Sequence, residues 1–209
     1  MKKIFIFSFL ILALSSFTEE KDFFVGKILY KFSFVDLEGN NITDKLAPYF
    51  GHEQHYFINN TNYKAYDENN SWTQLYNSES NSYYSFKKDK TAKRFDGALQ
   101  TSTLSTVMKL DTKETIAGYE CESIRIENDN SSTIYYFNPS IKTDSKKFEK
   151  HSFGSWNQYL EATNGALPLK FILTNKKNGY VWTSTAIEVS TLELKPADFT
   201  FPSDYLLKD

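Results

Sequence analysis

The chain has 209 residues and a mass of 24.3 kDa, which is the size of one domain. Its 24 basic and 26 acidic residues leave a formal net charge of -2, so it lacks the basic excess typical of nucleic-acid-binding proteins. Tyr, Phe and Trp make up 17% of the chain, with only 5 Pro and 8 Gly, a composition that excludes a fibrous or disordered protein.

Residues 1–18 have the pattern of a secretory signal peptide. Lys2 and Lys3 precede an apolar run over residues 4–14, which has the length of a signal-peptide core and is too short to span a bilayer. Ala13-Leu14-Ser15 is the predicted cleavage site and Ser16-Phe17-Thr18 the second choice; an uncleaved anchor or a buried N-terminal strand are the alternatives. We expect a mature protein of net charge -4, periplasmic or secreted, without a transmembrane span because no second apolar run follows.

The first half of the mature chain predicts a series of short strands. Residues 25–35 alternate, with Ile28, Tyr30, Phe32 and Phe34 on one face, which indicates a half-buried strand. Residues 43–50 predict one or two helical turns capped by Thr43. Clusters of Asn, Asp and Ser then separate five more predicted strands, at residues 54–59, 63–67, 72–76, 83–87 and 91–94.

The second half predicts further strands and one amphipathic helix. Strands are expected at residues 103–110, 115–127 and 132–137, with a β-bulge near Glu122 or Ser123 in the middle one. Over residues 145–163 the apolar positions take a helical period, which Gly154 interrupts. Residues 167–175 and 180–193 predict a closing hairpin. The expected fold is mainly β (α+β), in a single domain over residues 19–209.

The sequence offers little material for catalysis. His52 and His55 are three residues apart on a predicted strand, where they would face opposite sides, so surface positions are favoured over a metal site. Cys121, the single cysteine, is expected to be a buried apolar residue, and a dyad of Cys121 with His151 is the weaker alternative. We therefore expect a protein that is not an enzyme and uses neither a metal nor another cofactor.

Three segments resemble one family when taken in order. They are Thr115-Ile116-Ala117-Gly118-Tyr119-Glu120-Cys121; Ile134-Tyr135-Tyr136-Phe137-Asn138-Pro139 with Gly165-Ala166-Leu167-Pro168-Leu169-Lys170 after it; and Leu194-Lys195-Pro196-Ala197-Asp198-Phe199-Thr200-Phe201-Pro202. Together they resemble uncharacterised exported proteins of Bacteroidetes-type bacteria in the LolA-like superfamily, related to the periplasmic carrier of outer-membrane lipoproteins. The resemblance covers residues 110–202.

The resemblance implies a strongly curved antiparallel sheet, a half-barrel closed on its concave side by short helices. In LolA-like proteins an apolar cavity lies between these layers, and named members carry lipids or lipoprotein acyl chains between membranes. No position of this chain matches a ligand-contacting residue of the lipoprotein carrier.

Two functions follow as hypotheses. The first is a non-catalytic carrier or sensor whose cavity binds a lipid or acyl chain. Its lining would come from Tyr30, Phe32, Tyr119, Trp156 and Leu160, although for any single one of them a place in a filled core is slightly favoured. The second is a cell-envelope interaction module with a solid core, which would bind a protein or glycan through exposed tyrosines on its strands: Tyr63, Tyr66, Tyr83 and Tyr84. A cavity of hundreds of cubic ångströms would favour the carrier, and a packed interior the module.

Overall fold

A computed structural model describes residues 23–101 and 105–208. The predicted signal peptide and its cleavage site lie outside these residues. Within them, no helix has both the length and the apolar character that crossing a membrane requires.

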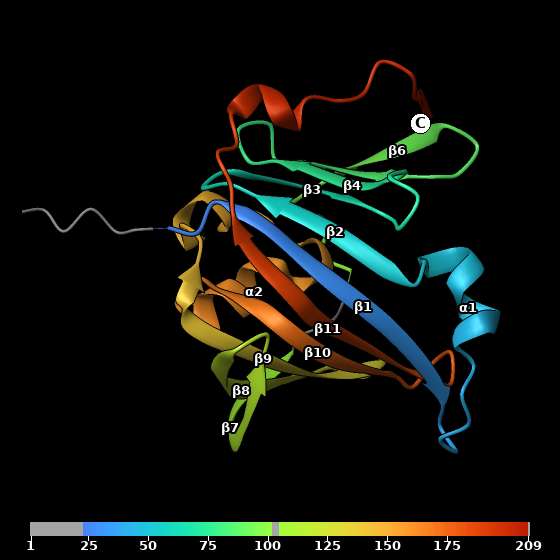
Figure 1. Cartoon of the computed structure of the whole chain (residues 1–209), viewed down its shortest axis with the longest axis vertical. Helices are drawn as coiled ribbons and strands as arrows, with labels where there is room; N and C mark the ends of the chain where they lie inside the picture. Colours follow the sequence, from blue (N-terminus) through green and yellow to red (C-terminus); the bar gives the residue numbers. More distant parts are fainter. Residues whose placement is uncertain (1–22, 102–104, 209) are drawn as a thin grey trace, which may run out of the picture.

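The described chain forms one curved, open sheet (Figure 1). Across it the strands run in the order β12-β6-β5-β4-β3-β2-β1-β11-β10-β9-β8-β7. Their bounds are β1 (Gly26–Asp36), β2 (Glu53–Ile58), β3 (Asn62–Tyr66), β4 (Trp72–Asn77), β5 (Ser82–Phe86), β6 (Thr91–Asp96), β7 (Thr106–Ile116), β8 (Tyr119–Glu127), β9 (Ser131–Lys142), β10 (Ala166–Asn175), β11 (Tyr180–Thr191) and β12 (Leu206–Lys208). The predicted mainly β, antiparallel architecture is confirmed, with one parallel pair where β12 lies beside β6.

The order shows how two meanders join at the centre. β1 pairs with β2 on one side and with β11, which comes from the other end of the sequence, on the other. The chain therefore passes from β6, near one edge, to β7, the opposite edge, before it returns strand by strand to β1. Side chains from both halves consequently meet above the central strands.

The helices are short: α1 (Thr43–Phe50), α2 (Trp156–Ala162) and the 3₁₀ turns η1 (Ser145–Phe148), η2 (Phe153–Ser155) and η3 (Pro196–Phe199). The predicted interruption at Gly154 is confirmed, because that residue has a φ of +65°. The predicted Thr43 cap is wrong. Ile42 is the N-cap, and the Thr43 hydroxyl instead bonds with the backbone of Phe34 on β1, where it accepts from the N–H at 3.0 Å.

Most of the strand predicted over residues 115–127 is β8. Residues 115 and 116 end β7, and a tight turn at Ala117 and Gly118, both with positive φ, leads into β8. The irregularity predicted near Glu122 or Ser123 is found in the pairing of β8 with β7, where the register shifts between Ser123, opposite Leu110, and Cys121, opposite Glu114. The extra residues lie on β7, and β8 pairs with β9 without a shift from Glu122 onward.

One face of the sheet carries the main core. Ile28, Tyr30, Phe32 and Phe34 of β1 are between 0% and 6% exposed, as their alternation predicts. We call the face that bears these four residues the inner face. η1, η2 and α2 pack on it; Tyr159 of α2, for example, lies 4.5 Å from Tyr135 of β9 between ring centroids.

A second, smaller core lies on the outer face of β4–β6. Leu75, Phe86 and Ala92 are buried there beneath Phe199 and Tyr205 of the C-terminal segment. Figure 1 shows this segment, in red, running over the strands from β3 to β6. The C-terminal residues thus protect an apolar patch that would otherwise face solvent.

Candidate functional site

The inner face contains a pocket of about 410 Å³. Twenty described residues line it, and they come from β1–β4, from β8–β11, from η2 and α2, and from Thr101, which precedes β7. The cross-strand register places them on one face: Tyr30 of β1 lies opposite Gln54 of β2, and Phe171 of β10 lies opposite Ser184 of β11. The pocket therefore exists only where the two meanders meet.

Seven aromatic side chains form much of the wall. The Tyr30 hydroxyl donates a hydrogen bond of 2.6 Å to the carbonyl oxygen of Pro168, which fixes its ring across β1 and β10. Trp182 of β11 stacks on Phe34 with a centroid distance of 5.5 Å and meets Phe32 edge-on at 5.1 Å. Such contacts hold the rings in place, so the wall is pre-formed.

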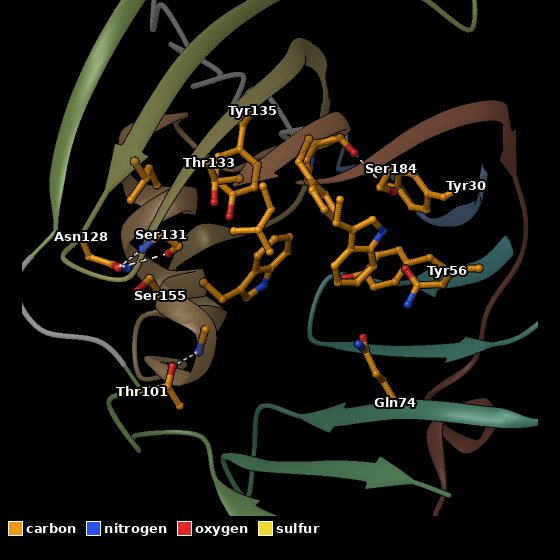
Figure 2. A pocket seen from close by; sticks show the side chains of 18 of the residues that line it. Tyr30, Tyr56, Gln74, Thr101, Asn128, Ser131, Thr133, Tyr135, Ser155 and Ser184 are labelled. Carbon is orange, nitrogen blue, oxygen red and sulfur yellow. Dashed lines mark hydrogen bonds between the residues drawn. The ribbon is translucent and has the colours of Figure 1, made fainter. Parts of the chain in front are cut away.

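Of the other lining residues, Ile126, Gly154, Pro168 and Leu173 are apolar, and the rest have polar, uncharged side chains. Figure 2 shows Asn128, Ser131, Thr101 and Ser155 together at one end, and Gln74 at the other end with Tyr30 and Tyr56. Much of the hydrogen-bonding capacity at the first end is already used: the Asn128 side-chain oxygen accepts from Ser131 N at 2.9 Å, and Thr101 Oγ1 accepts from Gly154 N at 3.0 Å.

Charge is absent from the described lining: none of its residues is Asp, Glu, Lys, Arg or His. Three donors on lining residues are enclosed without a hydrogen-bond partner among the described residues, namely Tyr56 Oη, Trp156 Nε1 and Trp182 Nε1. Burial raises the pKa of the Tyr30, Tyr56 and Tyr63 hydroxyls, so these groups stay neutral. The described lining can therefore hold apolar surface and form neutral hydrogen bonds.

Of the five residues predicted to line a cavity, Tyr30 and Trp156 line the pocket. Phe32 lies behind Trp182 and is 6% exposed, and Leu160 of α2 is fully buried in the core. Tyr119 begins β8 beside the β7–β8 turn and packs partly buried against the core. Sequence reasoning missed Trp182, although alternation along residues 180–186 would have placed it on a buried face.

The tyrosines expected to be exposed are not. Tyr63 and Tyr83 are inner-face core residues, 6% and 8% exposed. On the outer face, Tyr66 is half-buried against Trp72, and Tyr84 is half-buried against Phe201 of the C-terminal segment. Strand patterns alone could not show that Phe201 of the C-terminal segment covers Tyr84. These four tyrosines therefore do not form the exposed binding surface that the interaction-module hypothesis requires.

His151 is 1% exposed and belongs to the turn between η1 and η2. Its ring stacks on Tyr76 at 4.0 Å between centroids, and its Nε2 atom is 2.7 Å from Tyr63 Oη. Cys121 is buried, as predicted, and its thiol donates to the Tyr119 carbonyl oxygen at 3.4 Å. Neither residue lines the pocket, and the described residues contain no cluster of three potential metal ligands.

A likeness in fold is found with a solved structure. PNGF-II, in a C2 crystal form, matches 88% of this chain at 13% identity and a TM-score of 0.50; this chain spans 31% of the PNGF-II chain. The likeness concerns the fold alone. A LolA superfamily protein from Nitrosomonas europaea matches at 10% identity and a TM-score of 0.37, over 87% of this chain and 91% of that one.

A putative outer membrane lipoprotein-sorting protein domain from Vibrio parahaemolyticus matches at 9% identity and a TM-score of 0.33, over 83% and 89% of the two chains. These two matches are to proteins of the kind that the sequence resemblance named, and their TM-scores are too low to carry a fold, a ligand or a function over to this chain. No curated protein matches the sequence significantly. A family model covers residues 65–205, more than half of the chain, and the chain therefore belongs to the family described as domain of unknown function DUF4412.

Proposed function

We propose that this protein is a non-catalytic, exported binding protein that holds a hydrophobic ligand, a lipid or an acyl chain, in the inner-face pocket. The observation that carries the proposal is a pocket of about 410 Å³ whose described lining is half aromatic or aliphatic and without charge. This volume lies within the range of about 300–1,000 Å³ typical of small-molecule sites. A solid core would leave no such space.

The free energy of burial is sufficient to hold a single acyl chain. Burying one CH₂ group contributes about 0.8 kcal/mol, so a chain of about ten carbons gains about 8 kcal/mol, from which the cost of association is subtracted. In this proposal η2 and α2 close the concave side of the sheet over the ligand. Tyr30 and Trp156 contact the acyl chain. Phe32 and Leu160 support the pocket wall from the core side, and Tyr119 packs against the same core from the start of β8. The periplasm or the cell exterior is the proposed location, and a lipoprotein acyl chain is one candidate cargo.

Native mass spectrometry tests the proposal directly. The full chain is expressed with its own N-terminus, purified from the exported fraction without detergent, and measured before and after denaturation. We expect a lipid-sized adduct that is released on denaturation. A clean apo mass, together with no uptake of the neutral fluorescent probe N-phenylnaphthylamine, would contradict the proposal.

A pair of variants on β11 supplies the control. Ser184 is 1% exposed and lines the pocket, so Ser184→Phe places a ring in the space proposed for the ligand and should abolish probe uptake. Thr183 is the next residue and faces the outer side of the sheet, so Thr183→Phe adds the same ring elsewhere and should leave uptake intact. Equal uptake by the two variants would place the ligand outside this pocket.

A further inference from the structure

We infer that the ligand is an uncharged amphiphile whose hydroxyl or amide group meets the side chains of Gln54 and Gln74. The inference rests on the proposed function and names the chemical class of the ligand. It follows from the placement of two amides, from their free hydrogen-bonding groups, and from the neutrality of the walls around them.

The two amides share one end of the pocket. Gln54 of β2 lies opposite Tyr30 of β1, and Gln74 of β4 lies opposite Ala65 of β3. Ala65 itself lies opposite Tyr56, the next inner-face residue after Gln54, so the two amides are two strands apart on a diagonal that passes the small side chain of Ala65. Figure 2 shows the Gln74 side chain extending from β4 toward the pocket, on the side where Tyr56 is labelled. The small alanine leaves the space into which the longer side chains reach.

Both amides have free hydrogen-bonding groups. Gln54 and Gln74 are half-buried lining residues, and neither side chain makes a hydrogen bond to any described residue. Of the neighbouring hydroxyls, Tyr30 Oη donates to Pro168 O and Tyr63 Oη is bonded to His151, whereas Tyr56 Oη has no partner among the described residues and adds a third neutral group at this end. A carboxamide offers two N–H donors and one carbonyl acceptor, which matches a hydroxyl or amide group that both donates and accepts.

The surroundings disfavour an ionised group at this end. The described lining contains no lysine, arginine or histidine that could pair with a carboxylate or phosphate, and no acidic residue that could pair with an ammonium group. Moving a charge from water into such a site costs several kcal/mol unless a partner compensates it, whereas a neutral hydroxyl keeps its hydrogen bonds through the amides. The net charge of the chain, -2, adds no attraction for anions.

A head-group series tests the inference on the full chain. Decanol, decanoate and decyltrimethylammonium share one alkyl chain, and each is titrated against bound N-phenylnaphthylamine at neutral pH. We expect decanol to displace the probe at a concentration at least about tenfold lower than decanoate or the ammonium compound, which corresponds to about 1.4 kcal/mol.

Substitutions locate the effect. In Gln54→Leu and Gln74→Leu the affinity for decanol should fall about tenfold relative to that for the probe, because the hydroxyl loses its partner. In Gln74→Lys the order of affinities should reverse, with decanoate binding more tightly than decanol. Gln100 is exposed and outside the lining, so Gln100→Leu serves as the control that keeps the wild-type order. Circular dichroism and urea midpoints confirm that each variant is folded.

The outcomes separate the two proposals. Equal affinity for decanol and decanoate, or tighter decanoate binding by the wild type, overturns the inference and leaves the proposed function standing. Retention of the decanol preference in both leucine variants also overturns it. Absence of probe uptake by the folded wild type overturns the proposed function, and the inference with it.

Discussion

Protonation of His151 should destabilise the fold at mildly acidic pH. The imidazole is 1% exposed and packed among Tyr63, Tyr76 and Tyr83, and burial lowers its pKa from 6.5 to about 4. At intermediate pH the unfolded chain binds a proton that the folded chain does not. The free energy of unfolding is therefore highest above pH 6.5 and falls as the pH drops toward about 4.

The magnitude follows from the two pKa values. A difference of one unit corresponds to 1.36 kcal/mol, so the full loss is about 3 kcal/mol, of which about 2 kcal/mol falls between about pH 7.5 and about pH 5. Urea unfolding followed by tryptophan fluorescence at these two pH values measures it. The difference should appear as a shift of the midpoint at an unchanged slope.

His151→Phe is the matched variant, because a phenyl ring preserves the stacking on Tyr76 and cannot be protonated. It should lose the hydrogen bond to Tyr63, worth about 1 kcal/mol, and should show no further loss between about pH 7.5 and about pH 5. His52 is exposed, so His52→Gln should keep the wild-type pH dependence. A wild-type stability that is flat over this range, or a His151→Phe variant that keeps the full pH dependence, would refute the reasoning.

Three further predictions concern single residues. Gly165 has a φ of +84° and a Cβ there would collide with the Thr143 carbonyl oxygen, so Gly165→Ala should lower the free energy of unfolding by about 2 kcal/mol or more in urea titrations. Lys64 Nζ donates to the Asp198 carbonyl oxygen at 2.7 Å within a cage of four aromatic rings; Lys64→Met should cost about 1–2 kcal/mol and speed proteolysis of the C-terminal segment, and unchanged proteolysis would exclude this anchoring role. Burial raises the pKa of the Cys121 thiol to about 11, so a thiol reagent at mildly alkaline pH should label it only after unfolding; rapid labelling of the folded chain would contradict its burial.

The sequence predicted most strands because their signals are local. Alternation predicted a strand over residues 25–35, and the structure has β1 at Gly26–Asp36. The β7–β8 turn was missed because its first residue is Ala117, which adopts a φ of +48° that non-glycine residues seldom take. The Thr43 cap was misassigned because the hydroxyl finds a partner on β1, nine residues away in sequence, rather than in its own helix.

The site was predicted only in part. Tyr30 and Trp156 line the pocket, yet no pattern in the sequence distinguishes them from Phe32 and Leu160, which fill the core. The difference depends on which side chains meet from strands far apart. Tyr30 and Pro168, for example, are 138 residues apart in sequence and are joined by one hydrogen bond.

The sequence by itself determined the mainly β fold, most strand bounds and the apolar face of β1, because side-chain alternation and turn residues act over a few neighbouring positions. Only the tertiary structure decided that β1 pairs with β11 at the centre of the sheet, that the C-terminal segment covers Tyr84, and that a pocket whose described lining carries no charge remains on the inner face. These features arise from curvature and from contacts between distant residues, and a void is a property of the whole packing rather than of any segment.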